Sequence, residues 1–137
     1  MKRIIVYSQA QARAAAQAAA ERQVPIILMS APGMAGFMGP LWFKALVDEA
    51  ALSYPQADVT AMLDCADEAG TALAALRCGF QGVRFSGPEE ARARLADIAG
   101  QVGASVEGVV AAETLDLLDC NDPPAACRAF LASSAPD

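Results

Sequence analysis

Residues 59–85 read VTAMLDCADEAGTALAALRCGFQGVRF, and this stretch predicts one complete strand–helix–strand unit. The apolar run Val59–Leu63 is typical of a strand. A helical pattern follows and ends at Arg77, and Gly79 stands where a helix commonly has its terminating glycine. Gly82–Phe85 then forms a second short strand. The unit predicts two neighbouring parallel strands joined by a helix.

The same alternation continues on both sides of this unit. Further strands are expected at residues 4–7, 26–29 and 105–111, and further helices at 8–23, 41–54, 88–101 and from Asp122 onward; residues 31–40 are expected to be a loop, and the stretch after residue 111 to be irregular. Apolar strands joined by helices predict an α/β fold with a five-stranded parallel sheet. Five strands cannot close an eight-stranded barrel. The sheet is therefore expected to be a partial TIM-barrel-like structure or an open doubly wound three-layer sandwich, in one domain over residues 1–137.

Composition excludes several classes of partner. The chain has 137 residues and a net charge of −6, which disfavours binding to nucleic acid and to anionic membranes. The apolar runs are too short to span a membrane, and the N-terminal run ends too early for a signal peptide, so we expect a cytoplasmic protein. None of the four cysteines forms a CxxC pair, and we expect all of them to be reduced.

Six segments carry motifs that follow one another in a fixed order along the chain. The first three are an apolar strand that ends in serine and is followed by glycine, a helix, and a strand that ends in Leu-Asp. The last three are a Gly-Phe pair before a strand, a strand with a glutamate, and a helix that starts with Asn-Asp-Pro-Pro. The six segments are Val24–Gly33, Phe43–Ala50, Val59–Ala66, Ala74–Val83, Gly103–Glu107 and Asn121–Ala126. Their succession resembles the first five of the eight βα units of class II fructose-bisphosphate aldolases. The resemblance covers most of the chain and implies a truncated, barrel-type architecture.

The departures from that family bear on function. The resemblance implies an acid/base role for Asp64, but the zinc-binding histidine expected next is Cys65, and the sequence contains no histidine. The paired glutamates of the fifth strand become Glu107 and Val109. The phosphate-binding loops of the last barrel units have no counterpart in the printed sequence. Catalytic zinc needs about three protein ligands. We therefore expect no zinc-dependent aldolase activity and no cofactor.

Polar residues gather at the predicted carboxyl ends of strands, where sites lie in parallel α/β folds. The catalytic candidates are Asp64 and Glu107, and no metal ligand is expected. The ligand-binding candidates are Ser30, Gly33, Cys65, Asp67, Arg84 and Ser86. Ser8 would join these residues in one pocket. In the alternative interpretation, Asp67 caps a helix and Cys65 is a small buried residue. Arg84 would either bind an anion or, as we favour, pair with Glu107.

The loop Gly33–Trp42 has neither the spacing nor the Gly-Lys-Ser/Thr ending of a phosphate-binding loop. Its apolar side chains favour a lid or a contact with a second subunit, and we expect a homodimer. Three functions remain open. The first is a non-catalytic domain that binds a small ligand or a partner; the second is a small lyase or isomerase that uses Asp64 and Glu107 as acid/base groups; the third is a structural subunit of a homo-oligomer.

Overall fold

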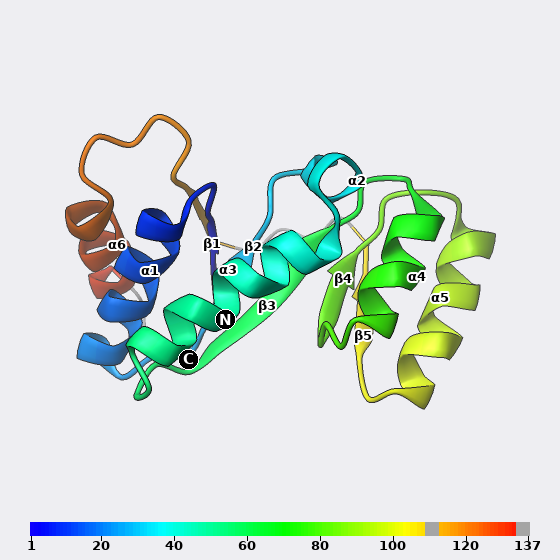
Figure 1. The fold of residues 1–137 in the computed structure, drawn as a ribbon, viewed down its shortest axis with the longest axis horizontal. Helices are drawn as coiled ribbons and strands as arrows, with labels where there is room; N and C mark the ends of the chain where they lie inside the picture. The colour runs from blue at the N-terminus through cyan, green and yellow to red at the C-terminus, as the bar shows by residue number, and fades with distance from the viewer. Residues whose placement is uncertain (109–112, 134–137) are drawn as a thin grey trace. The chain divides into compact units, whose positions relative to one another are not determined.

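The computed structural model describes residues 1–108 and 113–133. Strands and helices alternate along most of the chain (Figure 1). The strands are β1 (Lys2–Ile5), β2 (Ile26–Met29), β3 (Val59–Asp64), β4 (Gly82–Arg84), β5 (Ser105–Glu107) and β6 (Thr114–Asp116). The helices are α1 (Gln9–Arg22), α2 (Met34–Met38), α3 (Pro40–Ser53), α4 (Ala69–Arg77), α5 (Glu89–Gln101) and α6 (Pro123–Ala132).

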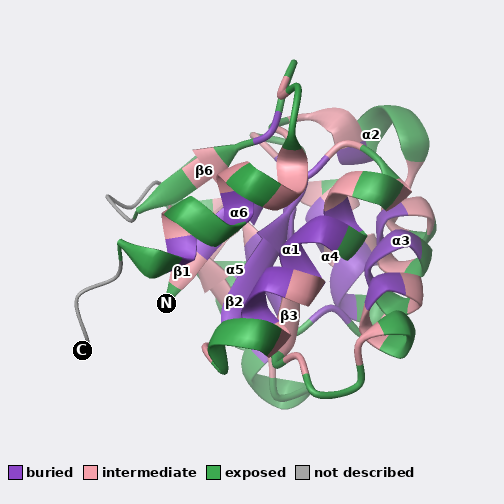
Figure 2. Ribbon diagram, turned by 90° about the vertical axis from the view of Figure 1, so that its left-hand side faces the viewer, coloured by how far each residue is buried: buried purple, intermediate pink, exposed green. Residues whose placement is uncertain are grey.

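The strands form a parallel sheet in the order β5-β4-β3-β2-β1-β6. Strands β5 and β6 stand at opposite ends of this order, so the sheet is open and not a closed barrel. The predicted α/β fold with a parallel sheet is confirmed. All four residues of β2 are buried, as expected for a parallel strand covered on both faces (Figure 2).

The sheet has six strands among the described residues, one more than the sequence predicts. The additional strand, β6, lies in the stretch that was expected to be irregular. Its three residues pair with β1 in the register Arg3↔Thr114, Ile4↔Leu115 and Ile5↔Asp116. Thr114 and Asp116 are exposed, so β6 contains no apolar run for a sequence pattern to detect. Pairing with β1 makes this segment a strand.

The predicted loop 31–40 contains a second difference, the short helix α2. Gly33 precedes this helix with a φ of 75°, and Gly39 follows it with a φ of 87°. Glycine adopts such left-handed conformations without the steric penalty of a side chain. The two glycines therefore allow the short helix α2 to form between two positions of positive φ. The predicted strand 105–111 is confirmed over Ser105–Glu107, and residues 109–112 lie outside the described part of the chain.

The chain divides into two compact units, and the expectation of one domain stays a prediction. Unit 1 comprises Met1–Leu28, Leu46–Thr60 and Ala112–Asp137, as far as these segments are described. In unit 1, helices α1 and α6 lie side by side (Figure 1). Six alanines of α1 are buried, and their small side chains suit close helix packing. Cys127 and Leu131 are the buried residues of α6.

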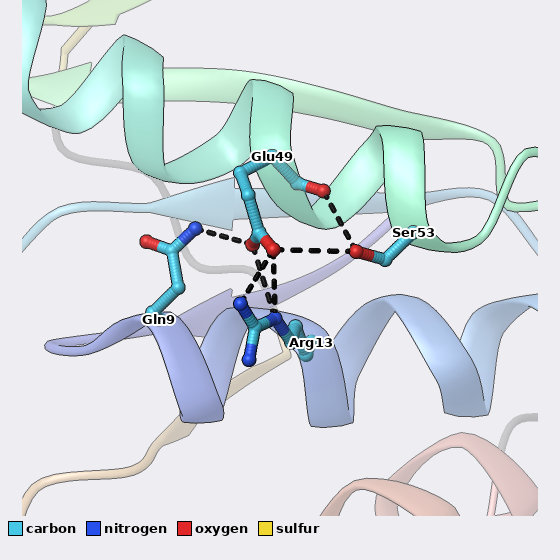
Figure 3. A network of polar contacts seen from close by, with 4 residues as sticks. All are labelled: Gln9, Arg13, Glu49 and Ser53. Carbon is cyan, nitrogen blue, oxygen red and sulfur yellow. Dashed lines mark hydrogen bonds and ion pairs between the residues drawn. The ribbon is translucent and has the colours of Figure 1, made fainter.

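A polar network also connects α1 with the part of α3 that belongs to unit 1 (Figure 3). Arg13 Nη2 donates a 2.6 Å hydrogen bond to Glu49 Oε1, and Gln9 Nε2 donates to the same carboxylate. Ser53 Oγ lies 3.3 Å from Glu49 Oε1. These hydrogen bonds, with that from Arg13 first, lower the pKa of Glu49 against the opposing effect of burial. The network keeps the Glu49 carboxylate charged and orients α3 against α1.

Unit 2 comprises Met29–Ala45 and Ala61–Ala111, again as far as described, and it contains the carboxyl-terminal ends of β3, β4 and β5. Leu63 and Val83 are fully buried. The rings of Phe43 and Phe80 stack with their centroids 6.5 Å apart. Helices α4 and α5 lie side by side (Figure 1). This apolar packing fixes the strands whose ends carry the polar residues described next.

Candidate functional site at the ends of three strands

Asp64, Arg84 and Glu107 are the last residues of β3, β4 and β5, and they are direct neighbours in the sheet register. Asp64 pairs with Arg84, and Arg84 pairs with Glu107. Side chains alternate between the two faces of a strand, so directly paired residues point to the same face. The three side chains therefore form one row, negative–positive–negative, which we call the strand-end row.

The guanidinium of Arg84 faces both carboxylates of the strand-end row. Arg84 Nη1 lies 4.0 Å from Asp64 Oδ2, and Arg84 Nη2 lies 3.6 Å from Glu107 Oε1. The exposed fractions are 6% for the Asp64 side chain, 17% for Arg84 and 21% for Glu107. Both distances are longer than those of direct hydrogen bonds, so the row is held by charge pairing. The predicted ion pair between Arg84 and Glu107 is present in the structure, and Asp64 is a second partner of Arg84.

The Asp64 carboxylate is fixed by the local backbone. The Ala66 N–H donates a 3.0 Å hydrogen bond to Asp64 Oδ1. This bond closes a tight turn in which Ala66 has a φ of 51°, a conformation that is uncommon for a residue with a side chain. The Asp64 N–H donates to Ser30 Oγ at 2.9 Å, and Ser30 itself is buried. Ser30 therefore connects its own loop to the end of β3, and Asp64 has little freedom to rotate.

Cys65 is fully buried beside this turn. Its Sγ donates a weak hydrogen bond to the Leu63 carbonyl oxygen at 3.7 Å. Burial raises the pKa of the Cys65 thiol to about 12, and the charges of Asp64 and Glu68 add to the effect. The group is therefore a neutral thiol near pH 7. A neutral buried thiol is a poor nucleophile.

The other candidates of unit 2 occupy other positions in the structure. Asp67 is exposed, and Glu68 is the N-cap of α4, so the prediction that Asp67 caps this helix is wrong. The Glu68 carboxylate instead lies against Gly36 of α2. Ser86 is exposed, and its N–H donates to the Ala66 carbonyl at 2.7 Å. Gly33 is the N-cap of α2.

Ser8, which was expected in the same pocket, belongs to unit 1 and is the N-cap of α1. Val109, the residue at the second glutamate position, lies outside the described residues. The sequence argument missed the contact between Arg84 and Asp64, although one signal was present. Asp64 directly follows one predicted strand and Arg84 lies one residue before the end of the next, and the ends of neighbouring parallel strands lie next to each other.

A family model for class II fructose-bisphosphate aldolase matches residues 1–110, which include the entire strand-end row. The chain belongs to the class II fructose-bisphosphate aldolase family. A class 2 fructose-bisphosphate aldolase from Synechocystis sp. is 31% identical to this family member over 106 residues. That alignment covers 67% of the chain and 30% of the Synechocystis protein. The chain thus matches less than a third of the length of this curated aldolase.

Solved structures show the same fold. A Coccidioides immitis protein assigned as a fructose-1,6-biphosphate aldolase superposes with a TM-score of 0.64 at 18% identity, over 79% of this chain and 45% of its own. A Sinorhizobium meliloti protein assigned as a tagatose 6-phosphate kinase gives a TM-score of 0.63 at 14% identity, over 96% and 44% of the two chains. At these identities the likeness concerns the arrangement of strands and helices.

The zinc that the aldolase resemblance implies does not fit the residues of this site. Residues 1–108 and 113–133 contain no group of three His, Cys, Asp or Glu side chains placed to hold a metal ion. Cys65, which the resemblance would place where the family has a zinc-binding histidine, is fully buried, and its Sγ is directed to the Leu63 carbonyl oxygen. The two carboxylates of the strand-end row already face the positive charge of Arg84.

Proposed function

We propose that this class II aldolase family member binds a small polar ligand at the strand-end row and does not carry out the family's metal-dependent aldol cleavage. The observation that supports the proposal is that the guanidinium of Arg84 faces both Asp64 and Glu107. A carboxylate that is held in place by a guanidinium can orient a ligand, because it accepts hydrogen bonds from the ligand's donor groups. The same carboxylate is already engaged, so it is poorly placed to coordinate a metal.

The chemistry of the row favours a hydroxyl-bearing ligand. The row carries two negative charges and one positive charge, and the exposed acidic residues Asp67 and Glu68 follow in the chain. This excess of negative charge opposes the binding of a phosphate group. Hydroxyl groups donate hydrogen bonds to carboxylates and accept them from a guanidinium, and they add no charge. A neutral polyol or sugar therefore fits the row better than a sugar phosphate.

The cleavage half of the proposal is tested with fructose 1,6-bisphosphate, the substrate in the family's name. We expect no release of triose phosphate by the purified chain above a protein-free blank, with or without added Zn²⁺ or Mn²⁺. Asp64→Ala is the matched variant, because contaminating aldolase would give the same rate in both preparations. Cleavage by the wild-type chain that disappears in Asp64→Ala would overturn the proposal.

The binding half is tested by ligand-observed NMR with a panel of unphosphorylated pentoses, hexoses and their alditols. We expect binding by the wild-type chain that weakens in Asp64→Asn and in Glu107→Gln. The control is Asp97→Asn, which removes an exposed carboxylate of α5. If these compounds bind equally well to the wild-type chain and to Asp64→Asn, or bind to neither, the row is not their site.

A second candidate function is a small lyase or isomerase that uses Asp64 and Glu107 as acid/base groups. It is favoured by the placement of both carboxylates on one face of the sheet, on either side of Arg84. The measurement is deuterium incorporation from D₂O next to the carbonyl of dihydroxyacetone and dihydroxyacetone phosphate. Exchange that is lost in both Asp64→Asn and Glu107→Gln would establish this candidate against the non-catalytic one.

Self-association is a third candidate, as a structural subunit of a homodimer. Phe37, Met38 and Leu41 have exposed fractions of 88%, 48% and 67%. They lie within five residues of each other in α2 and at the start of α3. Clusters of exposed apolar side chains are uncommon on monomeric proteins and mark contact surfaces.

A further inference from the structure

The strand-end row contains two largely buried carboxylates, which carry an electrostatic cost. The Asp64 and Glu107 side chains are 6% and 21% exposed, and both point to the same face of the sheet. Burying a carboxylate costs free energy unless a positive charge or hydrogen-bond donors compensate it. Two carboxylates one strand on either side of a common neighbour also repel each other. A cation between the two carboxylates offsets both costs.

Arg84 supplies that cation from the intervening strand. Its two terminal nitrogens divide between the acids, one at 4.0 Å from Asp64 and the other at 3.6 Å from Glu107. Neither distance corresponds to the short two-pronged contact that arginine makes with a single carboxylate. Arg84 Nε is buried and has no hydrogen-bond partner within the described residues. The guanidinium is thus shared between two acids and not docked onto one of them.

A divalent cation and the guanidinium cannot occupy this place together. Carboxylate oxygens are the ligands of hard divalent cations such as Mn²⁺ and Mg²⁺. A metal bound by Asp64 and Glu107 would lie a few ångströms from the positive charge of Arg84, where the repulsion is strong in a partly buried setting. The metal would also need oxygens that already face Arg84. Occupation by a metal requires the displacement of the arginine.

We propose that the Arg84 guanidinium takes the place between Asp64 and Glu107 that a divalent cation would occupy, and that it excludes such cations from the strand-end row of this aldolase-family chain. The proposal has two parts. The wild-type row does not bind a divalent cation, and removal of the guanidinium converts the same two carboxylates into a cation site. The inference concerns the resident cation of the row, so it stands or falls separately from the ligand proposed above.

The test is direct binding of Mn²⁺, followed by electron paramagnetic resonance of the free ion. Wild-type protein is expected to show no saturable site of one ion per chain that depends on Asp64. Arg84→Met, which keeps an unbranched apolar stem, is expected to bind one Mn²⁺ per chain with an affinity raised by about tenfold or more. The double variant Arg84→Met/Asp64→Asn is expected to lose this gain.

Two controls separate the row from surface charge. Arg92 pairs with Glu89 at 2.6 Å on the exposed surface of α5, so Arg92→Met removes an arginine from an ion pair without opening the row. We expect no gain of Mn²⁺ binding in Arg92→Met. Arg84→Lys keeps a positive charge and should also bind no Mn²⁺. Thermal unfolding provides a second measurement, because Mn²⁺ should raise the melting temperature of Arg84→Met and leave that of the wild type unchanged.

Two results would overturn the proposal. One is a wild-type Mn²⁺ site of one ion per chain that is lost in Asp64→Asn. The other is a folded Arg84→Met protein with no more Mn²⁺ binding than Arg92→Met. If Arg84→Met is unfolded without metal, Arg84→Gln takes its place, and refolding of either variant on addition of Mn²⁺ supports the proposal. The wild-type measurement needs no substitution, so it remains decisive in every case.

Discussion

Arg84 acquires its two partners from its place in the register. It ends the central strand of three neighbours, and an acidic residue ends each of the flanking strands. A one-residue shift of β4 would turn its side chain to the opposite face of the sheet. The ion pairs therefore depend on the same backbone pairing that buries Leu63 and Val83. Charge and apolar packing specify one common register.

The four cysteines are expected to differ sharply in reactivity. Cys65 and Cys127 are fully buried, and burial is the main cause that raises the pKa of each thiol to about 12. Cys78 and Cys120 are partly exposed. A thiol reagent that attacks the thiolate should therefore modify Cys78 and Cys120 in the native protein at pH 8, and all four cysteines after denaturation.

The cysteine prediction is checked with Ellman's reagent and peptide mapping. The matched control is the double variant Cys78→Ser/Cys120→Ser, which should show almost no reaction until it is unfolded. Fast modification of Cys65 in the native wild-type protein would contradict its burial. It would also return Cys65 to the set of candidate reactive groups.

The environment of Tyr7, a residue of unit 1, leads to a prediction of how the free energy of unfolding changes at alkaline pH. Burial, followed by a hydrogen bond with Asp116 and the charges of Asp116 and Asp119, raises the pKa of Tyr7 from 10.0 to about 12. A group with a raised folded-state pKa contributes stability that is complete below its unfolded pKa and is lost as pH rises through its folded pKa. The contribution of Tyr7 should be constant up to about pH 10 and decline toward pH 12.

Urea unfolding of the wild type and of Tyr7→Phe at pH 7, 9 and 11 measures this contribution. We expect the same difference in free energy of unfolding at pH 7 and 9, and a smaller difference at pH 11. Tyr54→Phe controls for the general effect of removing a phenol. A difference that grows with pH would have the wrong sign and would exclude the contact between Tyr7 and Asp116 as its source.

At the scale of the elements, helix ends were predictable because capping is local. Ser8 Oγ accepts a 3.2 Å hydrogen bond from the Gln11 N–H at the start of α1. Asp122 Oδ1 accepts one of 3.2 Å from the Ala125 N–H at the start of α6. Both caps can be predicted from the residue type alone, because serine and aspartate are preferred at N-caps. Strand β6 cannot be predicted in this way, because its conformation depends on β1, more than one hundred residues away in the sequence.

The caps lead to a prediction of stability. Replacing Ser8 or Asp122 by alanine should lower the free energy of unfolding by about 0.5–2 kcal/mol in each case, because a backbone N–H of the first turn loses its partner. Glu68 is the matched control, since it occupies the N-cap of α4 without a side-chain capping bond. Urea unfolding followed by circular dichroism gives the three values. An effect of Glu68→Ala as large as that of Ser8→Ala would contradict the capping argument.

At the scale of the whole molecule, the described residues give no membrane-crossing helix: none in 1–108 or 113–133 combines sufficient length with sufficient apolar character. The cytoplasmic location and the homodimer stay predictions. The homodimer can be tested by experiment through the exposed apolar side chains in α2 and at the start of α3. Their exposure is high for side chains of this size.

We predict that the chain self-associates through Phe37, Met38 and Leu41. Sedimentation of the wild-type protein at increasing concentration should show a dimer, because association would remove these side chains from water. The double variant Phe37→Ser/Leu41→Ser should remain a monomer at the same concentrations. Leu52→Ser is the control, because Leu52 is 80% exposed but lies near the other end of α3. A wild-type protein that is monomeric at every concentration would contradict the prediction.

The sequence alone determined the alternation of strands and helices, the capping residues and the absence of imidazole, because each of these depends on residue type or on neighbours a few positions apart. The sequence also placed Asp64 at the end of a predicted strand, and Arg84 and Glu107 within the two strands that follow. The tertiary structure decided that one guanidinium lies between two carboxylates, that Cys65 is sealed as a neutral thiol, and that a sixth strand pairs with the first. These features depend on register and burial, which arise only when segments distant in the chain pack together.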